Sequence, residues 1–252
     1  MTPSQWAALC RFRDAFRQQC EQWLIQGGGT AGWLAILQQE AAQANGTPNY
    51  SIETPVVYNR NLDCICQEDD IRLILIGDNP GKEEQKNANQ RYLVGQAGRL
   101  ADGFFSRNSE LSIHFRKQVL ILNKCPIHSA KTKELAYIKR MGGPAFEHLF
   151  QESQIWMARE TAALQHALGC SLWIVGYGEL RSKGLFSGYA ATLSDCYPNK
   201  GAEGPGKDVR LFQHFSMNRF TIDLSASRKE GESLLQSLDR TGIKHRKEIL
   251  SW

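Results

Sequence analysis

Apolar side chains recur at helical spacing in the first part of the chain. Six of them fall three or four positions apart: Trp6, Leu9, Phe12, Phe16, Cys20 and Trp23. This spacing predicts an amphipathic helix that ends at the glycines of 27–29. A second helical stretch over 33–43 ends at the turn-forming residues of 45–48. We therefore expect residues 1–60 to form a helical extension that packs on the core of a domain over 61–252.

Further along the chain, short runs of consecutive apolar residues alternate with helical patterns. These runs cover 71–77, 118–123, 171–176 and 209–214. Strands that alternate with helices favour crossover connections and a parallel sheet, and uninterrupted apolar runs are typical of strands covered on both faces. The pattern predicts a doubly wound α/β fold, a three-layer sandwich around a central, mainly parallel four-stranded sheet. Residues 195–208 are rich in Gly, Pro, Lys and Asn and predict an exposed loop.

Composition narrows the class of protein further. The length of 252 residues suits one buried core. A net charge of +4 permits a polyanionic partner without requiring one. The seven cysteines are an odd number without the spacing of a disulfide scaffold, and no secretion signal opens the chain. No apolar run reaches the roughly 20 residues of a bilayer span. We expect an intracellular, cytoplasmic monomer that does not bind membranes.

Polar residues directly follow the predicted strands, where open parallel sheets bind their ligands. The first run ends in Gly77-Asp78-Asn79-Pro80-Gly81, a rigid turn whose two short polar side chains are able to orient a water. The turn has neither the glycine spacing of a dinucleotide-binding loop nor the ending of a Walker loop. An ordinary turn between a strand and a loop is the alternative interpretation.

Three further segments carry candidate binding groups. Tyr92 precedes the small residues of 95–98 and offers a stacking face, although packing is the commoner role of such an aromatic residue. Asn123 ends the second run, and its amide has both a donor and an acceptor for the edge of a base; the alternative is an Asn that caps a turn. Lys183, in the turn after the third run, is a candidate phosphate contact.

The fourth run ends in a histidine at the same edge of the sheet. His214 is followed by hydroxyl, amide and guanidinium groups at Ser216, Asn218 and Arg219, with Met217 between them. A single histidine is commonly a structural residue, but this one closes the strand that is expected to neighbour the others. A functional role is favoured here.

Taken in order, these segments resemble the uracil-DNA glycosylase superfamily over residues 70–220. Residues 77–81 are similar to its water-activating motif. The Asn-Pro-Gly ending resembles the mismatch-specific and single-strand-selective branches, in which the equivalent of Asn79 positions the attacking water. Residues 92–98 resemble the thermostable iron-sulfur branch, in which the equivalent of Asp78 is the catalytic candidate. Asp78 and Asn79 therefore both remain candidates for the residue that holds the attacking water. Residues 120–123 resemble the strand whose final Asn reads uracil, and 213–216 resemble the histidine motif.

This resemblance implies a DNA glycosylase that hydrolyses the N-glycosidic bond of uracil or another deaminated base, in double- or single-stranded DNA, and so initiates base excision repair. It implies that Asp78 or Asn79 holds the water and that His214 stabilises the departing base. The implied substrate-binding residues are Gly77, Pro80, Tyr92, Asn123 and Ser216. The implied DNA contacts are Lys183, Met217, Asn218 and Arg219.

Several positions depart from the superfamily pattern. Phe215 stands where the histidine motif normally has proline, and Leu93 stands where an aromatic residue is common. Cys64, Cys66 and Cys125 lie in suggestive places for an iron-sulfur cluster, but no fourth cysteine occurs near 140–160. We therefore expect neither a metal nor another cofactor. Two alternatives follow, a relative that binds DNA without releasing a base and an α/β enzyme that acts on free nucleosides.

Overall fold

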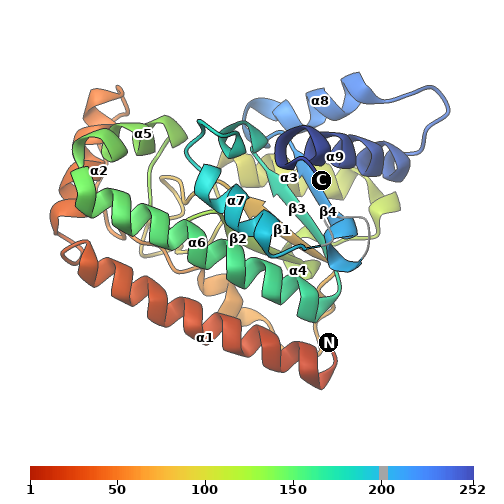
Figure 1. Ribbon diagram of the computed structural model, residues 1–252, viewed down its shortest axis with the longest axis horizontal. Coiled ribbons are helices and arrows are strands. Elements are labelled where there is room, and N and C mark those ends of the chain that lie inside the picture. Colours follow the sequence, from red (N-terminus) through yellow and green to blue (C-terminus); the bar gives the residue numbers. More distant parts are fainter. Residues whose placement is uncertain (199–203) are drawn as a thin grey trace.

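The computed structural model describes residues 1–198 and 204–252 and contains a four-stranded parallel sheet (Figure 1). The strand order is β2-β1-β3-β4, and every neighbouring pair is parallel. The strands are β1 (Leu73–Gly77), β2 (Val119–Asn123), β3 (Ser171–Val175) and β4 (Val209–Phe212). Because β2 and β3 flank β1 on opposite sides, the chain reverses its winding direction between β1 and β3. The expected doubly wound α/β fold is confirmed.

Helices cover both faces of the sheet, with α6 and α7 in front and α3 and α4 behind in the view of Figure 1. The α-helices in the described residues are α1 (Pro3–Gln26), α2 (Trp33–Ala44), α3 (Gln96–Arg107), α4 (Phe115–Gln118), α5 (Thr132–Met141), α6 (Gly143–Leu168), α7 (Ser187–Asp195), α8 (Arg219–Ser227) and α9 (Leu234–Leu250). Short 3-10 turns are η1 (Arg60–Cys64), η2 (Ser109–Leu111), η3 (Tyr177–Leu180), η4 (Gly204–Asp208) and η5 (Ser216–Asn218). Within 1–198 and 204–252, none of these helices is long and apolar enough to cross a bilayer.

The two N-terminal helices share the core of the sheet. Thr2 caps α1 through a capping box, and Gly27 ends the helix. Trp156 of α6 stacks on Phe16 of α1 with ring centroids 5.6 Å apart, and it meets Trp23 edge-on at 5.7 Å. The buried side chains of α1 and the strands belong to one continuous apolar cluster. The two expected helices are present, and the boundary at residue 60 stays a prediction.

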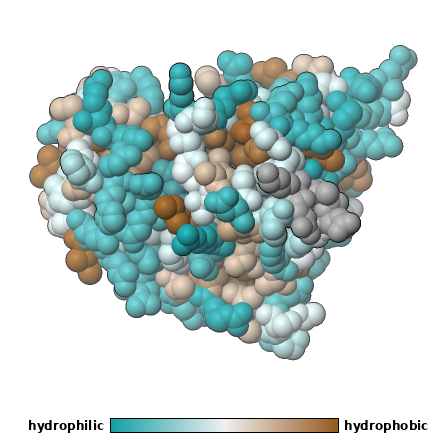
Figure 2. Space-filling view, viewed as in Figure 1, coloured by the Kyte–Doolittle hydropathy of each residue, from teal (hydrophilic) through white to brown (hydrophobic). Residues whose placement is uncertain are grey.

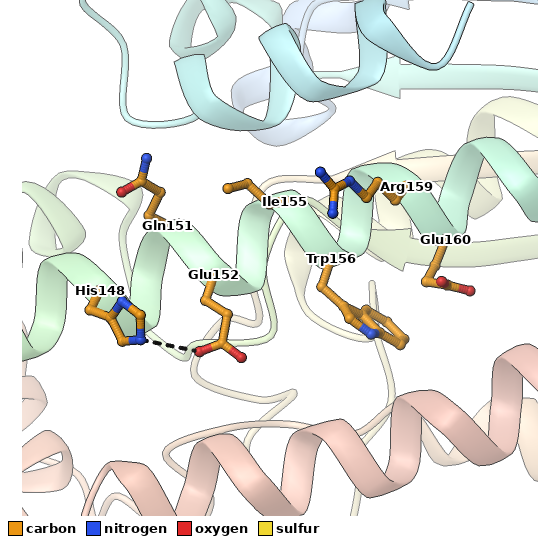
Figure 3. A pocket seen from close by; sticks show the side chains of 7 residues that line it. All are labelled: His148, Gln151, Glu152, Ile155, Trp156, Arg159 and Glu160. Carbon is orange, nitrogen blue, oxygen red and sulfur yellow. Dashed lines mark ion pairs between the residues drawn. The ribbon is translucent and has the colours of Figure 1, made fainter.

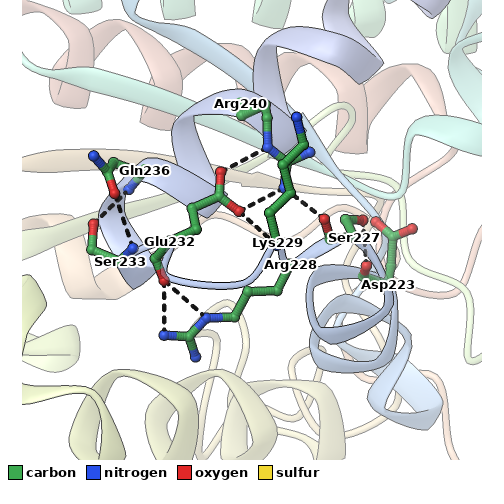
Figure 4. A network of polar contacts seen from close by, with 8 residues as sticks. All are labelled: Asp223, Ser227, Arg228, Lys229, Glu232, Ser233, Gln236 and Arg240. Carbon is green, nitrogen blue, oxygen red and sulfur yellow. Dashed lines mark hydrogen bonds and ion pairs between the residues drawn. The ribbon is translucent and has the colours of Figure 1, made fainter.

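A polar network holds the connection between α8 and α9 (Figure 4). Arg240 of α9 donates through Nε to Glu232 Oε1 at 2.7 Å, and Arg228 donates to the backbone oxygen of Glu232. The hydrogen bond from Arg240 lowers the pKa of Glu232 to about 2. Ser233 and Gln236 form the capping box that begins α9. The network fixes where α9 begins, and α9 in turn packs along β4.

Candidate active site

A cavity of about 610 Å³ lies at the carboxyl ends of the strands. This is the position at which open parallel sheets bind ligands, next to the reversal between β1 and β3. Seven residues predicted from the sequence line it together: Gly77, Asp78, Asn79, Asn123, His214, Ser216 and Met217. The sheet therefore brings chemistry from three separate segments of the chain to one place.

A buried ion pair ties three strands together at the floor of this region. Lys124, directly after β2, is fully buried, and its Nζ lies 2.5 Å from Asp78 Oδ1 after β1. The same ammonium donates to the backbone oxygen of Val175, the last residue of β3, at 2.6 Å. Gly176 follows with a φ of 81°, and a Cβ there would come within 2.5 Å of Asp78 Oδ1. The carboxylate is thus held on one side and has an immobilised counter-charge.

Asn79 is fixed through the donor end of its amide. Its Nδ2 donates to Ser129 Oγ at 2.9 Å and to the backbone oxygens of Ser129 and Pro80, both at 3.2 Å. Because the amide hydrogens are used in this way, Oδ1 is the end that remains to accept a hydrogen bond from a water.

His214 has a defined tautomer. Its Nδ1 accepts hydrogen bonds from the backbone N–H of Ser216 at 3.1 Å and from the Ser216 hydroxyl at 2.8 Å. A nitrogen that accepts from a backbone N–H carries no proton, so the proton of the neutral ring is on Nε2. Burial lowers the pKa of His214, an effect that the nearby Asp78 carboxylate opposes. The ring therefore serves as a neutral hydrogen-bond donor.

Asn123 presents an unsatisfied donor. The residue is 2% exposed and lines the cavity, and its Nδ2 has no hydrogen-bond partner within the described residues. A Cβ at Gly77 would lie 2.5 Å from Asn123 Oδ1, so only glycine at that position leaves the amide in place. A buried donor without a partner is unfavourable by about 1–3 kcal/mol. A ligand with a carbonyl oxygen at this point would remove that penalty.

The turn of residues 77–81 is anchored by a histidine that the sequence analysis missed. His128 is fully buried, and its ring contacts Pro80 O through Nδ1 and the Tyr50 hydroxyl through Nε2, both at 2.9 Å. Burial lowers the pKa of His128 to about 4. Gln38 of α2 donates to the backbone oxygens of His128 and Pro55 at 2.8 and 2.9 Å. The N-terminal segment thus supports the turn that holds Asn79.

Glu84 is a second buried group that sequence reasoning missed. Its Oε2 accepts from the backbone N–H of Gly81 at 2.6 Å. Burial raises the pKa of Glu84, and the backbone N–H groups of 93–95 oppose that shift. One carboxyl group therefore links the turn of 77–81 to the loop before α3. The only sequence signal was its position three residues after Gly81, where an acid caps a short turn.

The structure corrects the expected role of Tyr92. Its ring is 2% exposed, and its hydroxyl donates to the backbone oxygen of Val57 at 2.6 Å. The neighbouring Leu93, with a φ of 51°, lines the cavity instead. The left-handed backbone at Leu93 turns the two consecutive side chains in different directions. The prediction that Tyr92 lies in the pocket as a stacking platform was therefore wrong.

The segment after β4 is divided between core and surface. Phe215 is 1% exposed and stacks on Phe220 of α8 with ring centroids 4.3 Å apart, so its side chain belongs to the core. Met217 is 74% exposed at the edge of the cavity, and it adopts a φ of 53°. Asn218 and Arg219 are exposed beside it, where α8 begins.

Some predicted residues lie outside the cavity. Lys183 is exposed in the turn between η3 and α7 and does not line the pocket. Pro80 does not line the cavity either, but its backbone oxygen helps to hold the turn of 77–81 through contacts with His128 and Asn79. Cys64 is exposed and Cys125 is buried, and burial raises the pKa of Cys125 to about 12.

A separate hollow of about 400 Å³ runs along α6 (Figure 3). Seven side chains of this one helix line it, among them Trp156 and the pair of His148 and Glu152, which lie 3.8 Å apart. Figure 2 shows that this side of the molecule is largely hydrophilic. In the part of the chain that the structure describes, none of the residues that line this hollow has a buried polar atom without a hydrogen-bond partner. It does not have the features of a reaction centre.

Comparison of the sequence with protein-family models and with curated proteins found no match.

Proposed function

We propose that this protein is a DNA glycosylase that releases uracil, or another deaminated base with carbonyl oxygens, from DNA. The observation that carries the proposal is the presence of two hydrogen-bond donors in one cavity. Asn123 Nδ2 is buried without a partner, and the neutral His214 ring has its proton on Nε2. A base with two carbonyl oxygens would match both donors, whereas an amino group in place of a carbonyl would leave a donor unpaired.

The proposed chemistry follows the charges that develop when an N-glycosidic bond breaks. Negative charge collects on the departing base and positive charge on the sugar. A neutral donor such as His214 Nε2–H, held in place by the fold, stabilises the base anion as it forms. The carboxylate of Asp78 lies in the same cavity, where it would stabilise the positive sugar.

Of the two candidates for holding the water, the contacts favour Asn79. Asp78 Oδ1 is already bound by Lys124 at 2.5 Å. Asn79, in contrast, is immobilised through Nδ2, and its Oδ1 is left as an acceptor for a water hydrogen. In this proposal Asn79 positions the water and Asp78 contributes charge.

Access to the bond requires that the nucleotide leave the base stack, which costs a few kcal/mol in a duplex. Met217 is suited to fill the vacated space, because it is 74% exposed at the edge of the cavity. Arg219 and Lys183 are exposed at the same end of the sheet and are proposed to contact phosphates. A monomer inside the cell, acting on DNA, remains the expected setting.

The test is base release from labelled oligonucleotides that contain uracil, hypoxanthine or thymine opposite guanine, single- and double-stranded, with alkali used to cut abasic strands. Wild type is compared with His214→Ala, Asn123→Ala, Asn79→Ala and Asp78→Ala. Release that His214→Ala and Asn123→Ala abolish supports the proposal. Salt-dependent DNA binding without release would identify a lesion-binding relative instead. Turnover of a free nucleoside that does not depend on salt would identify a small-molecule enzyme.

A further inference from the structure

A second hollow, of about 340 Å³, lies between the end of α2 and α5. Its lining contains cationic, aromatic, amide and small side chains and no carboxylate: Ala44, Asn45, Lys133, Ala136, Tyr137 and Arg140. The two helices pack side by side at the upper left of Figure 1. None of these residues takes part in the proposed base release.

One face of α5 supplies most of this hollow. Lys133, Tyr137 and Arg140 are spaced by four and three positions, so they project from the same side of the helix. Ala136 lies between them, and its short side chain leaves the space open. The Arg140 guanidinium lies 5.4 Å from the centre of the Tyr137 ring. Aromatic and guanidinium planes of this kind are the surfaces on which unpaired bases stack.

The cations of this face have no acidic partners. In the described part of the chain, no carboxylate lies within 4.0 Å of the charged groups of Lys133, Arg140 or Lys131. On the same helix, by contrast, Lys139 pairs with Glu147 at 3.2 Å. Charge that is left unneutralised on one helix face is suited to a polyanion.

The hollow adjoins the active-site cavity through Lys131. This residue lines the cavity, and its Nζ lies 3.4 Å from the backbone oxygen of Asn45, which lines the hollow. A strand with its target base in the cavity would therefore reach the hollow with a nearby nucleotide.

We propose that this hollow binds an unpaired nucleotide of the strand that carries the target base, with the base against Tyr137 and a phosphate between Lys133 and Arg140. The inference rests on the proposed function, because it takes DNA as the substrate. It adds a preference for single-stranded DNA, since a base inside a duplex does not expose its face for stacking.

The experiment measures the affinity for labelled single strands in a His214→Ala background, so that the substrate is not consumed. One oligonucleotide has three nucleotides with uracil in the centre, and two others extend it by six nucleotides on the 5′ or the 3′ side. The variants are Lys133→Ala with Arg140→Ala, and Tyr137→Ala. Lys139→Ala is the matched control on the same helix.

The expected result is that one of the two extensions tightens binding and that the variants lose this gain. Tyr137→Ala should weaken the extended strand at least about fivefold. The double variant should reduce the slope of log affinity against log salt by about 0.7, which corresponds to one phosphate neutralised on a single strand. The affinity for the three-nucleotide strand should be the same in the variants and in the parent protein. Lys139→Ala should bind all the strands as the parent protein does.

The inference would be overturned if the α5 variants bound the extended strands as tightly as Lys139→Ala binds them. It would also be overturned if the variants lost as much affinity for a fully paired duplex as for the extended single strands. Failure of the proposed function has a different signature. It would appear as the absence of base release by the otherwise wild-type protein, whereas failure of this inference would leave base release intact and binding independent of α5.

Discussion

Lys124 Nζ lies 2.5 Å from Asp78 Oδ1 in a site where the lysine side chain is fully buried. The ammonium also donates to Val175 O, so it joins residues that follow or end three adjacent strands. This pair explains how a largely buried carboxylate is retained at the floor of the cavity. It also makes Lys124 a structural element of the site.

Removal of one partner of this pair should be far more harmful than removal of both. Lys124→Met leaves Asp78 largely buried without a counter-charge and should lower the free energy of unfolding by about 3–5 kcal/mol. Lys124→Met combined with Asp78→Asn should recover a large part of that loss. Urea unfolding of the three proteins checks this, and equal stability of the single and double variants would contradict a direct pairing.

The buried His128 predicts a pH dependence of stability. Its pKa is about 4 in the folded chain and 6.5 in the unfolded chain, so the unfolded state binds more protons between these values. Stability should therefore be fully present above pH 6.5 and decline as the pH falls toward 4. Between pH 7 and pH 5 the loss should be about 2 kcal/mol, at 1.36 kcal/mol per pH unit. Chemical unfolding at both pH values of wild type and His128→Asn tests this, and the variant should lose less.

Gly77→Ala should damage the site more than the fold. The new methyl group would lie 2.5 Å from Asn123 Oδ1 and would push the amide away from its position in the cavity. We expect destabilisation of about 1–3 kcal/mol from overpacking, together with loss of base release beyond what the stability change explains. Gly178→Ala is the control, because a Cβ there meets no atom within 4 Å. Full activity of Gly77→Ala would show that Asn123 does not need its present position.

The contact of Gln38 with the His128 backbone predicts that α2 affects the proposed base release from outside the cavity. Gln38→Ala removes hydrogen bonds at 2.8 and 2.9 Å. The buried carbonyl oxygen of His128 loses its donor, whereas Pro55 O keeps the backbone N–H of His128 at 3.0 Å, so stability should fall by about 1–3 kcal/mol. The rate of base release at saturating substrate should fall as well, because the turn that holds Asn79 loses support. The neighbouring Gln39→Ala, which removes an exposed hydrogen bond to Asn49, should change neither quantity.

Met217→Ala should separate duplex from single-strand activity. If Met217 fills the space of the extruded base, its loss should slow base release from a duplex about tenfold or more, which corresponds to a loss of about 1.4 kcal/mol of contact energy. Release from single strands should not change, because no base is extruded from a duplex there. Leu235→Ala, at an apolar residue that is 54% exposed on α9, is the control. An equal effect of Met217→Ala on both substrates would place this side chain in another role.

The sequence predicted the fold because each strand is a short, mainly apolar run followed by polar turn residues. β1 and β2 are buried at every position, as expected of strands covered on both faces. The same runs correctly placed Asp78, Asn79, Asn123 and His214 at one edge. The position of these four residues could be predicted from one rule, that the carboxyl ends of parallel strands lie at the same edge of a sheet.

The parts of the site that sequence reasoning missed depend on contacts between distant segments. Lys124 and His128 were inconspicuous, since a lysine or histidine after a strand is usually exposed, and only the packing of β3 and α2 shows that both are buried. Tyr92 was misplaced because a positive φ at Leu93 decides which of two adjacent side chains enters the cavity. Single-sequence patterns do not encode such a backbone angle at a non-glycine residue.

The central place of β1 in the sheet also governs how the nascent chain acquires its structure. β1 leaves the ribosome early, but one of its edges stays unpaired until β3 is made, and the cavity is incomplete until the segment after β4 delivers His214. Such distant pairings fold slowly and expose apolar strand edges in the meantime. Truncated chains that end before β4 should therefore aggregate, and the proposed base release should appear only when residues 209–252 have docked.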